Sequence, residues 1–294
     1  MRITENMRIA QTASTLNRSS RDVYDLTNMA STGRKVNKPS DSPAAYASIV
    51  SRNERMELLD SRKTALDRAE NDVSMAENTL ATAADIMVRA REIAVAMADA
   101  EPGPNERLAM AHEVENLREH LVALANTKGA RGYLFGGTNT QTQPFTLNGV
   151  FQGNDADINV EYADGQTAAV NISGQDAFTA LNGGRDILQD LSDLETELLA
   201  DNQAGVHALI TSIDQGHQQI TAARAEAGVK MSRFSSARAV TDNALVVVTE
   251  AQASDRDGET TEVFSDLANA QVAYERSLAV TRQVLSMATA LERF

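Results

Sequence analysis

The sequence predicts a mainly α-helical protein, in which the N- and C-terminal regions form a long antiparallel coiled-coil bundle and a small β-rich domain is inserted in the middle. Three observations lead to this fold class. Of the 294 residues, 46 are alanine, which has the best helix propensity and packs closely at helix seams. Apolar residues recur at helical spacing on both sides of the centre. Ten of the 16 glycines and six of the 12 aromatic residues lie between Gly129 and Gly184, so this stretch has a different structure from its flanks.

The first element is a helix with a thin apolar stripe, because Ile9, Leu16 and Val23 fall on one face of a 3.6-residue repeat. Residues 1–38 also hold seven basic and three acidic residues, a local positive excess. A stripe this narrow matches one antiparallel partner helix.

A joint between two helices follows in the segment ASTGRKVNKPSDSPAA, residues 30–45. Gly33 suits the left-handed end of the first helix, and Pro39 prevents that helix from resuming. Ser42 can cap the next helix, with Pro43 at its first position. We therefore take Gly33, Pro39, Ser42 and Pro43 as the domain joint.

Long helices follow the joint. From Leu59 to Met97 apolar residues alternate at steps of three and four, with Arg62 as the polar exception. Residues 102–104, Pro-Gly-Pro, stop this helix, and a second stripe from Met110 to Leu124 predicts an antiparallel return. Beyond the middle segment the helical pattern resumes at Ile187.

The middle segment predicts a β-hairpin and a small aromatic core. Ile158, Val160 and Tyr162 alternate with polar residues before the turn pair Asp164-Gly165, and a second alternating run follows. The expected core beneath the hairpin consists of Tyr133, Phe135, Phe145, Phe151 and Phe178.

The last 32 residues carry two neighbouring apolar seams, one through Phe264, Leu267 and Tyr274 and the other through Val263 and Ala270. Together they exceed the stripe of about 100° that a surface helix buries. We infer that the two chain ends pair with each other and that a further face remains for other chains. The residues expected at the subunit interface are Ile9, Leu16, Val23, Leu278, Val280, Val284, Leu285, Met287 and Leu291.

These patterns divide the chain into three expected domains. Residues 1–38 and 255–294 form a terminal helical domain, residues 39–128 and 185–254 a helical bundle domain, and residues 129–184 the β-rich inserted outer domain.

Composition and motifs favour no enzymatic chemistry. There is no cysteine, which excludes disulfides, and the net charge of −14 argues against nucleic-acid binding. No apolar run is long enough for a bilayer, and the first residues do not read as a cleaved signal peptide. His112 and His120 lie about 12 Å apart along a helix, too far to share a metal ion. We expect no catalytic residues, no metal site and no cofactor.

Four stretches of the sequence are distinctive: Met1-Arg-Ile-Thr4, STGRKVNKPSDSP from Ser31 to Pro43, LANTKGARGYLFGG from Leu124 to Gly137 with Pro144-Phe145, and the apolar C-terminal helix ending at Phe294. Together they resemble the flagellin-like axial proteins of the bacterial flagellum, and among them the hook–filament junction proteins. Ser42 stands where the family usually has aspartate, and Arg34-Lys35 reverses the commoner order. Both departures are chemically mild.

The resemblance implies an exported, non-enzymatic structural protein of the flagellum that joins hook to filament through coiled-coil terminal helices. Its implied partners are the other hook-associated junction protein, flagellin, a flagellar export chaperone and further copies of itself in a ring or helical layer. It implies an extracellular location, reached by type III export without a cleaved signal peptide. Two alternatives remain open: a short flagellin, and a cytoplasmic coiled-coil scaffold or signalling protein, which alanine-rich helices and acidic charge suit equally well.

Overall fold

The computed structural model describes residues 5–291, and the chain divides into two compact units. The terminal unit comprises Met1–Leu58 and Ala244–Phe294, and the central unit comprises Leu59–Asn243. The unit boundaries fall inside two long helices, α2 (Pro43–Met97) and α6 (Gln203–Arg256). The predicted division into three domains with boundaries at the joint and around the insertion stays a prediction.

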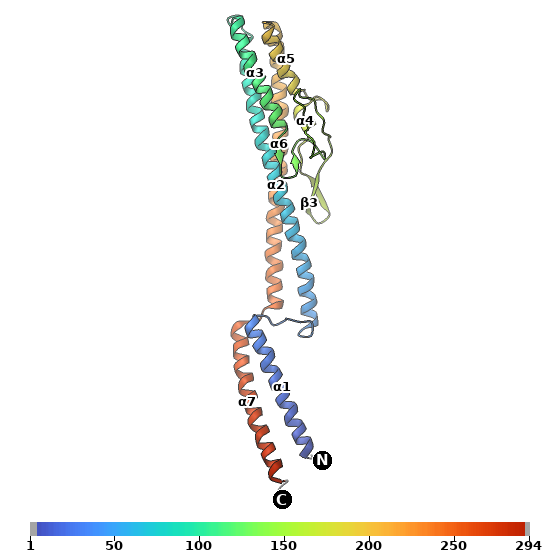
Figure 1. Cartoon of the computed structure of the whole chain (residues 1–294), viewed down its shortest axis with the longest axis vertical. Helices are drawn as coiled ribbons and strands as arrows, with labels where there is room; N and C mark the ends of the chain where they lie inside the picture. The colour runs from blue at the N-terminus through green and yellow to red at the C-terminus, as the bar shows by residue number, and fades with distance from the viewer. Residues whose placement is uncertain (1–4, 292–294) are drawn as a thin grey trace. The chain divides into compact units, whose positions relative to one another are not determined.

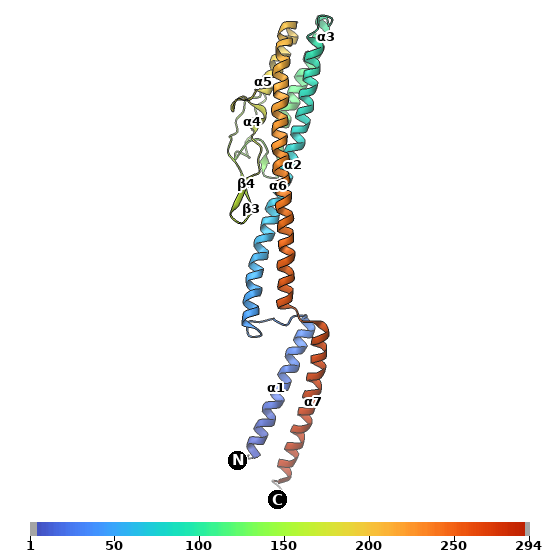
Figure 2. The same cartoon turned by 180° about the vertical axis from the view of Figure 1, so that it is seen from behind.

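The terminal unit is built on two helices, α1 (Glu5–Thr32) and α7 (Thr260–Leu291), which lie side by side and antiparallel (Figures 1 and 2). The beginning of α2 and the end of α6 complete it. The two terminal helices therefore pair with each other.

The central unit is a helical bundle in which α2, α3 (Pro104–Ala125), α5 (Ile187–Leu199) and α6 lie side by side (Figure 1). The α2 stripe predicted from the sequence forms its core: Leu66, Ala69, Val73, Leu80 and Met87 are all buried. The α2 and α6 helices run antiparallel and are joined by ion pairs, among them Arg224–Glu77 at 2.8 Å and Lys63–Asp242 at 2.6 Å.

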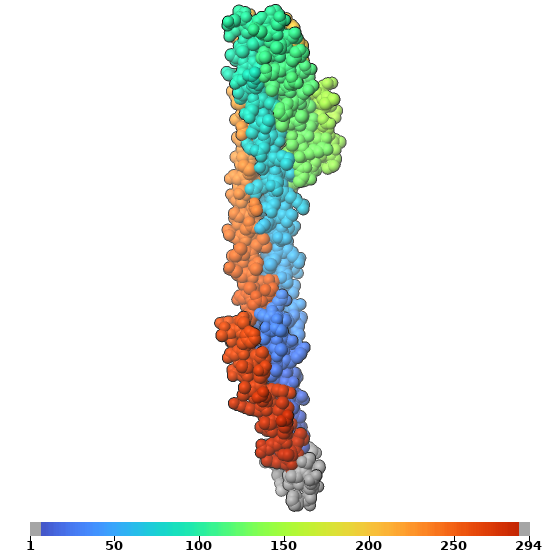
Figure 3. Space-filling view, turned by 60° about the vertical axis from the view of Figure 1, so that its left-hand side comes forward, coloured from blue at the N-terminus to red at the C-terminus, as the bar shows by residue number. Residues whose placement is uncertain are grey.

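The insertion forms the yellow-green bulge on the flank of this bundle in Figure 3. It contains two small antiparallel sheets. One sheet pairs β1 (Lys128–Gly129) with β2 (Gly132–Tyr133); the other pairs β3 (Asn159–Ala163) with β4 (Gln166–Ala169). In the second sheet Val160 lies opposite Ala168, as the alternating pattern requires, and a short helix α4 (Gly174–Phe178) follows. The predicted fold class, mainly α with a small β-rich insertion, is confirmed.

Aromatic rings hold the insertion together. Phe178 meets Phe135 edge to face with ring centres 5.3 Å apart, and it meets Phe145 at 5.6 Å. Phe151 packs against Phe145 at 5.1 Å. Tyr133 differs from the prediction, because its half-buried ring lies beneath the Lys128 ammonium at 4.6 Å instead of in this cluster.

Arg62, the polar exception in the α2 stripe, anchors the hairpin to the bundle. Its guanidinium bonds Glu161 of β3 at 2.8 Å and Asp164 in the hairpin turn at 2.6 Å, while its side chain is only 8% exposed. The break in the apolar pattern thus marks where the insertion docks.

None of the helices within the described residues has the length and apolar character that crossing a membrane would require.

Candidate assembly interface

The α1–α7 pair has no fully buried side chain among those that the structure describes, residues 7–32 and 260–287. Its seam consists of half-buried residues, including Ile9, Leu16 and Val23 on α1 and Leu278 and Val284 on α7. Ser19 Oγ and Ser277 Oγ meet across it at 3.3 Å. Two helices alone cannot enclose a core, so the pair leaves apolar area open.

Large apolar side chains of α7 lie outside this seam. Phe264 is 54% exposed, Val272 45%, Val280 52% and Met287 50%. On α1, Tyr24 is 64% exposed. Exposed apolar residues gathered on one helix are typical of a surface that another chain covers.

The residues expected at the subunit interface fall into two groups. Those in the seam of the pair are half-buried: Ile9, Leu16, Val23, Leu278 and Val284. Val280, Leu285 and Met287 are exposed. The side chain of Leu291 lies outside the described residues, as do the opening Met1–Thr4 and the closing Phe294.

Tyr24 and Val272 were not singled out from the sequence. Neither residue belongs to the periodic apolar stripe of its helix, and an isolated apolar residue gives no periodic signal. Only the packing of α1 against α7 shows that they face outward.

The joint is fixed by main-chain geometry. Gly33 has φ +70°, and its N–H donates to the Met29 carbonyl at 2.8 Å, which ends α1. This left-handed conformation favours glycine because a Cβ would come too close to the residue's own carbonyl oxygen, even though no other part of the chain lies within 4 Å of that position. Pro39 lies in the turn that follows, Pro43 is the first residue of α2, and Ala45 N–H faces Ser42 Oγ at 3.4 Å.

The α6–α7 connection is hydrogen-bonded to the joint. Lys35 N–H donates to the Arg256 carbonyl at 2.8 Å, and Gly258 N–H donates to the Gly33 carbonyl at 3.0 Å. The Lys35 ammonium also bonds the Ser254 carbonyl at 2.6 Å. These bonds link segments more than 200 positions apart, which local sequence patterns cannot reveal.

Two carboxylates, Asp41 in the joint and Asp257 in the α6–α7 connection, have lowered pKa values. The Asn37 N–H at 3.0 Å, together with the Lys38 N–H at 3.1 Å, lowers the pKa of Asp41 below its usual value. The neighbouring Arg256 guanidinium lowers the pKa of Asp257. Both effects favour the charged state because hydrogen bonds and cations stabilise a carboxylate.

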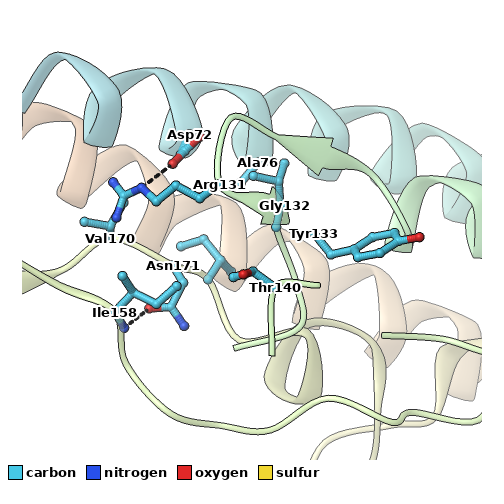
Figure 4. Close-up of a pocket in the computed structure, with 11 residues that line it drawn as sticks. Asp72, Ala76, Arg131, Gly132, Tyr133, Thr140, Ile158, Val170 and Asn171 are labelled. Carbon is cyan, nitrogen blue, oxygen red and sulfur yellow. Dashed lines mark hydrogen bonds and ion pairs between the residues drawn. The ribbon is translucent and has the colours of Figure 1, made fainter. Parts of the chain in front are cut away.

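The insertion offers one small cavity against α2 (Figure 4). Arg131 Nε lies 3.0 Å from Asp72 at its edge, and Asn171 Oδ1 accepts a bond from the Ile158 N–H at 2.8 Å. Its volume of about 20 Å³ holds about one water molecule, far below what a small-molecule site needs. The described residues also contain no cluster of histidine and carboxylate side chains that could hold a metal ion.

The comparisons with known proteins agree with this architecture. The sequence model of the bacterial flagellin N-terminal helical region matches residues 3–140, from the first helix through the glycine-rich start of the insertion. The chain is 23% identical over 216 residues to flagellar hook-associated protein 3 of Salmonella typhimurium, covering 73% of this chain and 68% of that protein.

The chain resembles flagellar hook-associated protein 3.

The Escherichia coli hook-associated protein 3 is 26% identical over 228 residues, covering 76% of this chain and 72% of that protein. A solved structure described as a putative flagellar hook-associated protein, from Vibrio parahaemolyticus, superposes with a TM-score of 0.68 at 20% identity, covering 74% of this chain and 100% of that one. The flagellar junction protein FlgL of Legionella pneumophila gives 0.57 at 16% identity, covering 71% and 99%. At these identities the solved structures establish the shared fold.

Proposed function

We propose that this protein is a structural subunit of the bacterial flagellum that joins the hook to the filament and assembles through α1 and α7. The observation that carries the proposal is the open helix pair: α1 and α7 contact each other, yet large apolar side chains of α7 stay about half exposed. The resemblance to hook-associated protein 3 supports the same role. Repeated side-to-side contacts of this kind generate a ring or a helical layer.

The partners follow from this role. Neighbouring copies would cover the exposed face of α7, and the layer would lie between the other hook-associated junction protein and the first flagellins. Before assembly an export chaperone would shield the same apolar surface on the way through the type III apparatus to the cell exterior. The protein would act mechanically, without catalysis, as the resemblance to structural flagellar proteins supports.

The proposal is tested in the host by deleting the chain and examining cells by electron microscopy. We expect hooks without filaments, restored by the wild-type chain. Normal filaments on the deletion strain would overturn the proposal.

A pair of variants tests the surface. Val280→Asp places a charge on the exposed face of α7, and Val229→Asp does the same at a valine that is 62% exposed on α6 in the central unit. Because neither side chain is buried, both variants should keep the helical circular dichroism of the wild type. We expect only Val280→Asp to lose filament formation, and equal complementation by both variants would show that α7 is not the interface.

A short flagellin is the second candidate, favoured by the match of residues 3–140 to the flagellin N-terminal region. Quantitative immunoblotting of sheared flagella separates the two. A junction subunit is a minor component, while a filament subunit makes up most of the protein.

A further inference from the structure

Charged side chains on α1 and α7 are segregated by sign along each helix. Over the residues whose side chains are described, α1 carries three basic and then two acidic residues: Arg8, Arg18, Arg21, Asp22 and Asp25. In the same way α7 carries three acidic and then two basic residues: Glu262, Asp266, Glu275, Arg276 and Arg282. All ten are exposed.

The sign changes at the same height on both helices. The helices are antiparallel, and the contact between Ser19 and Ser277 fixes their register. On α1 the change falls between residues 21 and 22, and on α7 between residues 275 and 276. At 1.5 Å per residue these two points differ by about 2 Å along the axis. The pair therefore has a basic half toward the chain ends and an acidic half toward the joint.

These charges have no opposite charge beside them within the described residues, although Arg21 Nε donates a hydrogen bond to the Asn17 carbonyl at 3.2 Å. None of the ten forms an ion pair within the part of the chain that the structure describes. The central unit differs, because many of its surface charges are paired, for example Arg238 with Asp67 at 2.8 Å. The helix dipole accounts for Glu262 in the first turn of α7, but it does not account for a reversal from Arg21 to Asp22 in the middle of α1.

We propose that neighbouring parallel copies pack side by side with an axial offset, so that the basic half of one α1–α7 pair lies against the acidic half of the next. This inference rests on the proposed function and identifies the partner of the interface as a second copy of this chain. Parallel copies at the same height would place like charges together, which disfavours that contact. The centres of the two charge groups lie roughly 10 residues apart along the axis, which corresponds to an offset of about 15 Å.

The offset has an architectural consequence. A side-to-side contact that repeats with an axial step builds a helical layer, whereas a contact without a step closes into a flat ring. The charge pattern thus selects the helical form.

Cross-linking between copies tests the offset, because the chain has no cysteine and any introduced thiol is unique. Ser20 on α1 and Ser265 on α7 are exposed and lie 11 residues apart in height, about 16 Å. Cells co-expressing Ser20→Cys copies and Ser265→Cys copies would be sheared, and their flagella treated with a bis-maleimide of about 10 Å span. The control mixture combines Ser20→Cys with Ala279→Cys, which is exposed at nearly the same height as Ser20.

We call the mixture of Ser20→Cys with Ser265→Cys the offset mixture, and the mixture of Ser20→Cys with Ala279→Cys the level mixture. We expect the offset mixture to give at least five times more cross-linked product between copies than the level mixture. More product from the level mixture would overturn the inference while leaving the proposed function intact. Absence of the wild-type chain from sheared flagella would instead overturn the proposed function.

Exchanging charges between the copies tests whether these charges cause the axial offset. Adding Arg18→Glu and Arg21→Glu to the Ser20→Cys copy should reduce the offset product about fivefold. Adding Glu262→Arg and Asp266→Arg to the Ser265→Cys copy should then restore it, because opposite charges face each other again. An unchanged product in the first step, or no recovery in the second, would show that these charges do not set the contact.

Discussion

Arg107 on α3 caps the C-terminal end of α2, and replacing it by alanine should destabilise the central unit. Its side chain is only 7% exposed and bonds three separate segments: the end of α2, the α2–α3 connection and the α5–α6 connection. Nε donates to the Met97 carbonyl at 3.2 Å, Nη2 donates to the Asp99 carbonyl at 2.9 Å, and Nη1 pairs with Asp201 at 2.5 Å. One cation thus caps the C-terminus of α2 and holds the α5–α6 turn.

The size of the stability loss in Arg107→Ala depends on which of the three partners can bond to water instead. Asp99 and Asp201 are exposed and rehydrate, so their loss costs little. The half-buried Met97 carbonyl loses a charge-assisted bond worth about 1.5–3 kcal/mol, and the buried stem adds roughly 1 kcal/mol. The total is about 3 kcal/mol, or a fall in melting temperature of roughly 6–12 °C for a unit of this size.

Thermal unfolding followed by circular dichroism at 222 nm measures the shift, and hydrogen exchange over residues 94–99 locates it. Arg89→Ala is the matched control, because Arg89 is 47% exposed and makes surface ion pairs that contribute less than about 1 kcal/mol. Arg107→Lys should give an intermediate shift, since an ammonium cannot reach all three partners. If Arg107→Ala melts no lower than Arg89→Ala, the capping argument is wrong.

Three other changes test separate parts of the structure. Arg62→Met should increase hydrogen exchange across residues 159–169 while changing overall stability by only about 1 kcal/mol, because the lost partners are exposed carboxylates. The lowered pKa of Asp41 means that its bonds stabilise the joint above its unfolded pKa and are lost as pH falls through the lower folded value. Amide exchange at residues 37 and 38, corrected for intrinsic rates, should therefore rise below about pH 4 in the wild type but show no such step in Asp41→Asn. Gly228→Ala should raise stability by about 0.5–1 kcal/mol because a Cβ there meets open space, while Gly137→Ala should lower it because φ is +65° and the Cβ would clash with backbone.

Each of these predictions has a contrary outcome. Unchanged exchange in the hairpin after Arg62→Met would show that ring packing alone holds the insertion. A pH step that persists in Asp41→Asn would assign the titration to another group. Equal effects of the two alanine substitutions would contradict the described backbone conformations.

Local sequence patterns were enough to predict the helices and the hairpin. The α2 stripe from Leu66 to Met87 is buried as predicted, and Val160 pairs with Ala168 across the predicted turn. Periodicity succeeds here because side-chain direction repeats with the backbone, every 3.6 residues in a helix and every second residue in a strand. The fold class depends on these repeats and was therefore accessible from residue order.

The α7 helix shows what local sequence patterns cannot predict. Two apolar seams run along it, and its half-buried residues include Val263 and Ala270 from one seam and Leu267 and Tyr274 from the other. Periodicity allows either seam, and only the register with α1 selects the mixture. The outward position of Val280 follows from that selection.

Residue order along this chain specifies which segments are helical, where α1 stops and which segment is inserted, because these features depend on neighbours within a few positions. Partners far apart in the chain had to come from packing: Arg62 with the hairpin turn, Lys35 with Ser254, and α1 with the particular face of α7 that it covers. Such contacts depend on how two surfaces fit in three dimensions, and a one-dimensional repeat carries no information about the height at which two helices meet.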